Sequence, residues 1–236
     1  MVKIGNFFFH YRNGLLPAFF LLILVPSREL FSNPTIALLI GLGISLLGQI
    51  IRGTTIGLVY IVRGGQNRKI YANDLVTTGI FSHCRNPLYV GNIAVSIGMG
   101  IASNSVLFFS VITPLIIFVY IAIVSAEENF LRNKFGEAYN EYTRDVNRWI
   151  PNLQGITKTF ESHKFAWKRV LLKEYNSTFS GSLLGILLIM KAVYEHPAQY
   201  GDFNEKILTF SVIIAIMTLT YLFVRFLKKS HRLVAD

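Results

Sequence analysis

Apolar segments recur along the whole chain, and this pattern limits the folds that the sequence can adopt. They cover residues 15–31, 35–51, 88–101, 106–125, 178–193 and 207–226. A helix needs about 20 apolar residues to cross the hydrocarbon core of a bilayer, and most of the segments approach that length. Backbone polar groups in lipid must be satisfied within the segment. The chain is therefore expected to be all-α, a polytopic membrane helical bundle of about six transmembrane helices.

Positively charged residues are sorted between the two ends of these segments. The chain carries a formal net charge of +10, although only 15% of its residues are charged. If the N-terminus is cytoplasmic, every Lys and Arg falls in a cytoplasmic segment except Arg28, Lys191 and Lys206. The positive-inside rule thus predicts an integral, multi-pass membrane protein with N- and C-termini cytoplasmic. It also explains the basicity without a nucleic-acid partner.

The segments divide the chain into three parts. Residues 1–151 are expected to form a membrane core. Residues 152–177 form a basic and aromatic linker, which is typical of an interfacial helix lying on anionic lipid. Residues 178–236 are expected to add two C-terminal transmembrane helices, with no role evident beyond membrane embedding. Residues 1–13 lack a cleavable signal pattern, so the first helix is expected to stay.

A short helical hairpin is predicted at the centre of the core. The segment 88–101 is short for a full span, a polar turn follows at 102–105, and 106–125 returns across the membrane. Pro114 is expected to kink the returning helix. The preceding apolar segment is rich in small residues, which let helices approach closely in lipid. These residues are Gly41, Gly43, Ser45 and Gly48.

A polar motif, GIFSHCRNPLYVG, precedes the hairpin at residues 79–91. Arg85 has the planar donor group that suits a carboxylate or a phosphate. Asn86 adds an amide, and Pro87 begins the third helix at its first position, where a missing N–H costs nothing. Tyr89 offers a ring and a hydroxyl at the membrane edge. The alternative interpretation is a basic and aromatic anchor beside the membrane.

A second polar motif, at residues 127–151, follows the hairpin. Glu127 and Glu128 lie where the fourth helix leaves the membrane, a depth at which carboxylates are costly. A continued helix would align one face of side chains, and Gly136 would let another backbone approach. That face consists of Glu128, Leu131, Phe135, Tyr139 and Tyr142. The alternative is an amphipathic helix whose glutamates pair with Arg132 or Arg144.

The hairpin returns both motifs to one face of the membrane, so their side chains are expected to converge. An Arg suits a carboxylate, a Glu suits an ammonium group or ribose hydroxyls, and aromatic faces suit a sulfonium cation. The converging residues are Arg85, Asn86, Tyr89, Glu127, Glu128, Tyr139 and Tyr142. Cys84, the one cysteine of the chain, is expected to be a packing residue.

The two motifs, in this order, resemble the isoprenylcysteine carboxyl methyltransferase and phospholipid methyltransferase superfamily. The resemblance is carried by Arg85-Asn86-Pro87-Leu88-Tyr89-Val90-Gly91, then Glu127-Glu128, Phe135-Gly136, Tyr139, Tyr142, Arg148 and Pro151. It implies an integral-membrane methyltransferase that binds S-adenosylmethionine from the cytosol over the hairpin. A lipophilic small molecule or lipidated substrate would enter from the bilayer, with membrane lipids as the other partner, no nucleic acid and no obligate protein partner.

The resemblance also implies a set of site residues and no metal. The residues with catalytic roles would be Glu128, Arg85 and Asn86. The cofactor-binding residues would be His83, Arg85, Asn86, Pro87, Tyr89, Gly91, Glu127, Glu128, Tyr139 and Tyr142. A neutral amine acceptor loses a proton, which Glu127, Glu128 or His83 would take.

The chain departs from the family pattern at three places. Many members have His at the position of Asn86, and they often have Tyr at the position of His83 and Arg at the position of Ser82. Many carboxyl-methylating members also carry an Arg one turn before the glutamate pair, where this chain has Ile123 and Val124. The missing cation weakens the prediction of an isoprenylcysteine-like carboxylate acceptor relative to a lipid amine or similar group.

Two other classes of function remain open from the sequence. The NADPH-dependent membrane sterol-type reductases share a related hairpin, but they typically present an Arg-Asp-Glu stretch where this chain has Ser125-Ala126-Glu127-Glu128. A non-catalytic membrane scaffold or transporter is the other. It would need polar residues deep in the bilayer, and the predicted spans hold few.

Overall fold

The computed structural model describes residues 1–59, 65 and 68–233, and this part of the chain is helical apart from its turns and loops. The helices are α1 (Val2–Leu21) with the 3-10 turn η1 (Leu22–Leu24), α2 (Pro34–Leu58), η2 (Gly79–Ser82), α3 (Pro87–Ala102), the π-helical turn η3 (Phe108–Ile112) leading into α4 (Thr113–Phe135), α5 (Glu137–Asp145), α6 (Ile156–Ser162), α7 (Trp167–Glu195), α8 (Pro197–Tyr200) and α9 (Phe203–Lys229). Five are long and apolar enough to cross a membrane, and α3 is shorter. The predicted polytopic helical bundle is confirmed.

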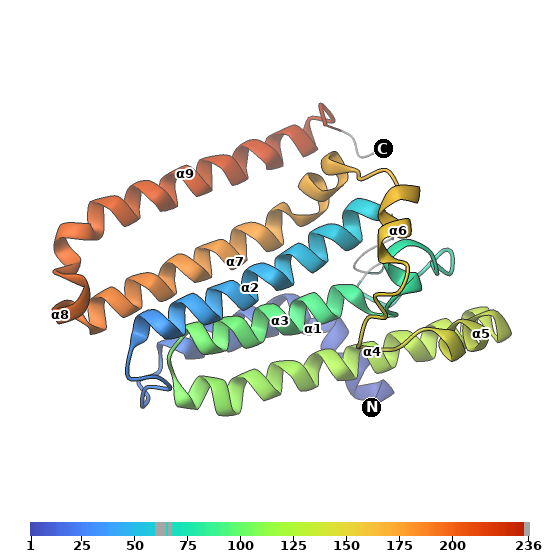
Figure 1. Cartoon of the computed structure of the whole chain (residues 1–236), viewed down its shortest axis with the longest axis horizontal. Coiled ribbons are helices and arrows are strands. Elements are labelled where there is room, and N and C mark those ends of the chain that lie inside the picture. The colour runs from blue at the N-terminus through green and yellow to red at the C-terminus, as the bar shows by residue number, and fades with distance from the viewer. Residues whose placement is uncertain (60–64, 66–67, 234–236) are drawn as a thin grey trace.

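The long helices lie side by side in the order α9, α7, α2, α3 and α4, and α1 packs behind them against α4 (Figure 1). Both ends of the chain, α5 and α6 lie at one end of the bundle, hereafter the site end (Figure 1). The opposite end holds α8 and the turn between α3 and α4. Arg28, Lys191 and Lys206 belong to that opposite end, so the bundle sorts its cations as the sequence predicts. Arg63, another cation of the charge pattern, lies outside the described residues.

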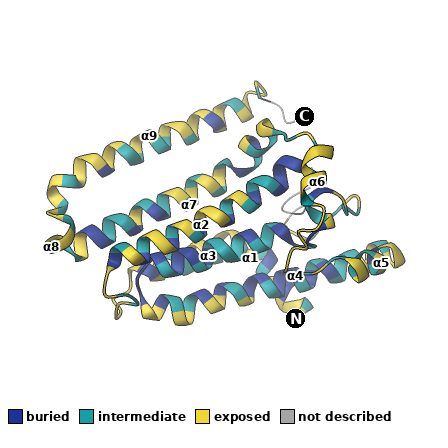
Figure 2. Ribbon diagram, in the orientation of Figure 1, coloured by how far each residue is buried: buried dark blue, intermediate teal, exposed yellow. Residues whose placement is uncertain are grey.

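Each of α2, α7 and α9 has an exposed face (Figure 2). Leu39 and Leu47 of α2 and Leu208 and Leu219 of α9 are exposed. Exposed apolar faces of this extent on parallel helices are typical of a surface that contacts lipid. The structure is therefore that of an integral membrane protein.

Close packing of α2 on α3 fixes the position of the hairpin. A Cβ added at Gly41 would lie 2.3 Å from the backbone nitrogen of Ala102, and one added at Gly48 would lie 2.6 Å from the carbonyl oxygen of Gly91. Only glycine permits this approach, as predicted for the small residues of α2. Gly43 faces open space instead. Gly91, expected to bind cofactor, is placed within this helix interface.

One glycine, Gly136, and one proline, Pro114, shape α4. Gly136 ends the helix with φ 55° and ψ −123°, and α5 begins at the next residue. The predicted continuous helical face from residue 128 to 142 is therefore wrong, because the chain turns at Gly136. Nothing lies within 4 Å of a Cβ added there, so the glycine serves backbone conformation rather than close approach. Before Pro114 the helix is irregular, with π-type turns over Phe108–Ile112.

Two boundaries differ from those expected. The first helix begins at Val2 rather than near residue 15, because α1 continues through its polar residues to the site end. The linker predicted over 152–177 ends early, since α7 begins at Trp167. No Gly or Pro occurs between Trp167 and Gly181 to stop a helix. The basic side chains of that stretch consequently lie on the first turns of α7.

Candidate functional site

A backbone tie joins the loop before α3 to the loop after α5. The Arg85 N–H donates to the Asn147 carbonyl at 2.9 Å, and the Asn152 N–H donates to the His83 carbonyl at 2.9 Å. The His83 ring lies 2.6 Å from the Asn152 carbonyl through Nδ1 and 2.8 Å from the Thr159 hydroxyl through Nε2. Both ring nitrogens thus contact the 152–159 segment. The structure thus places His83 in this tie.

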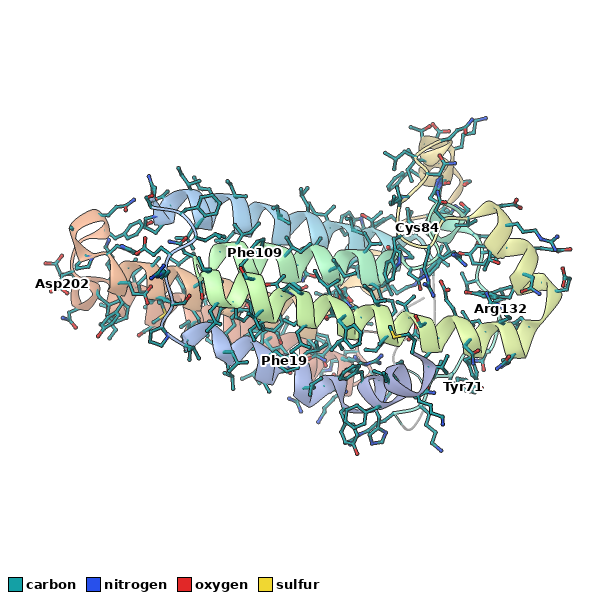
Figure 3. The ribbon with its side chains drawn as sticks, turned by 90° about the horizontal axis from the view of Figure 1, so that it is seen from below. Phe19, Tyr71, Cys84, Phe109, Arg132 and Asp202 are labelled. Atoms are coloured by element: carbon teal, nitrogen blue, oxygen red, sulfur yellow. The ribbon has the colours of Figure 1, made fainter. Side chains whose placement is uncertain are left out.

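Cys84 is buried in the same tie, at the site end marked in Figure 3 by Cys84 and Arg132. Its Sγ lies 3.6 Å from the Arg148 carbonyl. Burial raises the pKa of the thiol above its ordinary value, which keeps it protonated and a weak nucleophile. Its geometry supports the predicted packing role.

Glu128 is the centre of a buried clamp, defined by Glu128, Arg85, Asn86 and Arg148. The Asn86 amide donates to Glu128 Oε1 at 2.9 Å, and Arg148 Nη2 lies 2.7 Å from Oε2. Arg85 Nη1 lies 3.8 Å from Oε1. The alternative pairing with Arg132 or Arg144 is wrong for Glu128. The clamp joins the N-terminus of α3, the end of α4 and the loop after α5.

Glu127 has different surroundings from its neighbour. The Tyr89 hydroxyl donates to Glu127 Oε1 at 2.6 Å. Oε2 accepts no hydrogen bond from the part of the chain that the structure describes. Consecutive helical residues are rotated by about 100°, so the two carboxylates leave α4 in different directions.

A cavity of about 750 Å³ opens beside Glu127 at the site end. Its wall includes seven of the residues expected to bind cofactor: Arg85, Asn86, Pro87, Tyr89, Glu127, Tyr139 and Tyr142. His83, Gly91 and Glu128 do not line it. For Glu128 this changes the expected role, because the carboxylate lies behind the wall and holds Arg85 and Asn86 in place.

Two tyrosines of α5, the buried Tyr139 and the partly buried Tyr142, line the cavity. The Tyr142 hydroxyl donates to the Phe81 carbonyl at 2.7 Å. Burial, followed by the nearby charge of Glu128, raises the pKa of Tyr139 to about 12. Burial also raises the pKa of Tyr142 well above its ordinary value. Both phenols are therefore neutral near pH 7, and their rings, 6.1 Å apart between centroids, form an uncharged aromatic wall.

Several wall residues come from outside the two motifs. They are Phe9, Arg12, Asn13 and Leu16 of α1, Arg52 of α2, the loop 70–76, Asn92, Tyr120, and Lys173, Ser177 and Lys228 of α7 and α9. The sequence predicts an apolar segment that ends at residue 51, but α2 continues to Leu58 and the structure buries Arg52 within it. A signal was present, because Ile50 and Ile51 precede Arg52 and apolar residues resume at Ile56, and a charge at that depth requires a partner.

The family model for phospholipid methyltransferases matches residues 35–138. This stretch contains the hairpin, the Glu127–Tyr89 pair and three members of the clamp. These 104 residues are less than half of the chain, and they are similar to the phospholipid methyltransferase family. The expected superfamily is thereby confirmed for the hairpin and the polar residues on either side of it.

Two curated proteins are similar to the chain. The nickel-cobalt-cadmium resistance protein NccN of Alcaligenes xylosoxydans xylosoxydans is 29% identical over 122 residues, which cover 52% of this chain and 55% of that protein. The cobalt-zinc-cadmium resistance protein CzcN of Cupriavidus metallidurans is 36% identical over 81 residues, which cover 34% and 37%. The chain thus spans about half or less of these relatives. No solved structure matches it.

The phospholipid methyltransferase segment does not contain the whole cavity. Tyr139 and Tyr142 follow it, and the wall residues of α1, α7 and α9 lie outside it. Within the described residues, no group of three or more His, Cys, Asp and Glu side chains is placed to hold a metal ion. The wall of the cavity combines Arg and Lys side chains, the carboxylates of Asp74 and Glu127, amides and aromatic rings.

Proposed function

We propose that this protein transfers a methyl group from S-adenosylmethionine to a lipophilic, membrane-borne acceptor. The observation that carries the proposal is the position of the cavity. It lies where α3 and α4 of the phospholipid methyltransferase segment meet the site end, and its wall combines Arg85, Glu127 and aromatic rings. In this proposal the site end faces the cytosol, with both chain termini.

The residues of the wall fit the cofactor in size and charge. A volume of about 750 Å³ lies within the range of small-molecule sites, roughly 300–1,000 Å³. Arg85 Nε is buried without a hydrogen-bond partner among the described residues, which suits a carboxylate ligand. Glu127 Oε2 is available to an ammonium group or a hydroxyl, and the rings of Tyr139 and Tyr142 suit a cation.

When bound, S-adenosylmethionine would supply the methyl group of its sulfonium. The leaving group is the neutral thioether of S-adenosylhomocysteine. The protein has to hold the two reactants in line and exclude water. Arg85 and Asn86, fixed by Glu128, form the polar floor of the cavity. Tyr89 orients Glu127 through the 2.6 Å hydrogen bond. Of the two carboxylates in the wall, Glu127 and Asp74, we assign to Glu127 the proton that a neutral amine acceptor loses.

The acceptor is a lipid amine or an isoprenylcysteine-like carboxylate. Ile123 and Val124, where carboxyl-methylating members of the superfamily carry an Arg, are fully buried packing residues. Cations nevertheless reach the wall from other helices, namely Arg12 of α1 and Arg52 of α2. A carboxylate acceptor therefore stays within the proposal.

Ligand binding and methyl transfer test the proposal together. We expect S-adenosylhomocysteine, and not NADPH, to raise the unfolding temperature of the purified protein. We also expect membranes holding the protein to pass label from methyl-labelled S-adenosylmethionine into lipid-extractable material. Stabilisation by NADPH alone would favour the reductase class, and no effect of either ligand would favour a scaffold.

A further inference from the structure

A buried ion pair joins α2 to α7 inside the bundle. Arg52 Nε donates to Glu174 Oε2 at 2.9 Å, and Arg52 Nη2 donates to Oε1 at 3.0 Å. Their side chains are 6% and 5% exposed. Arg52 Nη2 also donates to the Ser177 hydroxyl at 3.0 Å, and Nη1 donates to the Asn92 side-chain oxygen. The network therefore connects three helices, α2, α3 and α7.

Stability alone is a weak reason for such a network. A buried ion pair loses hydration that its own attraction only partly offsets, and apolar residues of similar volume are often as stable. Ionisable side chains inside a membrane bundle generally mark a site where a ligand binds or passes. The Arg52 pair lies at this depth, since Arg52 precedes the end of α2 by six residues, about 9 Å along the helix.

The network forms part of the wall of the cavity. Arg52, Asn92 and Ser177 all line it, with Lys173 beside them on α7. Asn92 lies six residues after Asn86 on α3, which places it about 9 Å deeper in the bundle than the cofactor residues. The cavity thus continues from the Arg85 and Asn86 floor toward α7. A ligand that fills only the outer part leaves this inner polar part for a second molecule.

The hydrogen bonds of Arg52 leave N–H donors available in the inner part of the cavity. The guanidinium of Arg52 has five N–H groups, and the four bonds to Glu174, Ser177 and Asn92 use four of them. One N–H on Nη1 has no acceptor among the described residues, and it lies beside the side-chain amide N–H groups of Asn92. These donors suit an oxygen atom of an acceptor headgroup. The bidentate contact with Glu174 fixes the plane of the guanidinium.

We propose that Arg52, oriented by Glu174 and Ser177 of α7, is a positioning residue for the methyl acceptor. This inference rests on the proposed function. It gives α7, which lies outside the phospholipid methyltransferase segment, a role beyond membrane embedding. Arg52 holds the headgroup of the lipophilic acceptor in the inner part of the cavity, while Arg85 and Glu127 serve the cofactor in the outer part.

The test separates acceptor handling from cofactor binding and from folding. The variants are Arg52→Lys, which keeps the charge but loses the planar fork, and Ser177→Ala, which leaves the ion pair intact. Ser180→Ala is the matched control, an exposed serine on the same helix that does not line the cavity. The measurements are the affinity for S-adenosylhomocysteine by calorimetry and methyl transfer into vesicles of total lipid from the expression host.

We expect Arg52→Lys to raise the apparent KM for the lipid about tenfold and Ser177→Ala to raise it about threefold. The affinity for S-adenosylhomocysteine should stay within twofold of wild type in both. If Arg52→Lys fails to fold, Ser177→Ala alone decides. An unchanged KM in Ser177→Ala would overturn the inference, and so would a fall in affinity for S-adenosylhomocysteine that accompanies the rise in KM. Either result would mean that the Arg52 network only holds the helices together. A wild type that binds no S-adenosylhomocysteine would overturn the proposed function instead.

Discussion

The cavity wall at Glu127 and the clamp at Glu128 are built on adjacent residues of α4, yet their surroundings differ. Glu127 accepts one hydrogen bond, from Tyr89, and faces the cavity. Glu128 is surrounded by Asn86, Arg85 and Arg148 and does not reach the cavity. Among the described residues, Glu127 Oε2 has no hydrogen-bond donor, whereas both oxygens of Glu128 have partners within the clamp. From this difference we propose that the carboxylate of Glu127 binds a ligand and that the carboxylate of Glu128 holds the site together.

The largest expected effect is the loss of the clamp. Glu128→Ala leaves Arg85 and Arg148 without their shared carboxylate in a buried place, and removing one partner of a buried ion pair costs about 3–5 kcal/mol. We expect the free energy of unfolding to fall by about that amount. The measurement is an SDS titration in bicelles, read by a thiol-reactive dye on Cys84, which is fully buried in the folded state.

The matched control for this loss is Glu137→Ala. Glu137 pairs with Arg144 at 3.1 Å on the surface of α5, where both side chains are mostly exposed. Exposed pairs contribute about 0–1 kcal/mol, so this variant should unfold close to wild type. Equal losses of unfolding free energy in Glu128→Ala and Glu137→Ala would show that the clamp stabilises the fold no more than an exposed ion pair does.

The next largest effect is expected from a change in the cavity wall, at Glu127. Glu127→Gln keeps the shape of the side chain and the hydrogen bond from Tyr89 but removes the charge. We expect S-adenosylhomocysteine to bind about tenfold more weakly, because an ammonium group loses a charge-assisted partner. The free energy of unfolding should change little, in contrast to Glu128→Ala. Calorimetry gives the affinity, and a Glu127→Gln protein that binds as tightly as wild type contradicts the assignment of the wall.

The contrast between wall and clamp also shows what the sequence could reveal. The helical segments, the hairpin and the convergence of Arg85 with Glu128 follow from hydrophobic pattern and spacing. The separate roles of the two glutamates do not, because they depend on the rotation of α4 and on the partners that approach it. Arg148 is one of the residues that carry the resemblance to the methyltransferase superfamily, but its pairing with Glu128 requires the turn at Gly136. The contributions of Arg52 and Ser177 arise from contacts between distant helices.

A smaller effect is expected from the hydroxyl that orients Glu127. Tyr89→Phe removes the 2.6 Å hydrogen bond to Oε1 and leaves the ring in the wall. A hydrogen bond to a charged group contributes about 1.5–3 kcal/mol at most, and water that enters the cavity can replace part of it. We therefore expect a loss of about threefold in affinity for S-adenosylhomocysteine. In Glu127→Gln the same Tyr89→Phe change should cost less, and a full additive loss in the double variant would contradict the coupling of the two side chains.

The smallest expected effect is a change in the pKa of Tyr139. This residue lies in the wall, but the charge of Glu128 in the clamp influences it. Burial first, and Glu128 second, raise its pKa to about 12 from an ordinary value near 10. The folded state thus holds this proton more tightly than the unfolded state. The stability it contributes is complete below pH 10 and is lost as the pH rises through 12.

The difference in tyrosinate absorbance between wild type and Tyr139→Phe should show one group that titrates near pH 12. Glu128→Gln removes the negative charge, so the same difference in that background should move to a lower pH. It should remain above pH 10, because burial is the larger cause. A Tyr139 that titrates at pH 10 in wild type would mean that water reaches the phenol. A shift of equal size in Glu127→Gln would mean that the wall and the clamp act on Tyr139 alike.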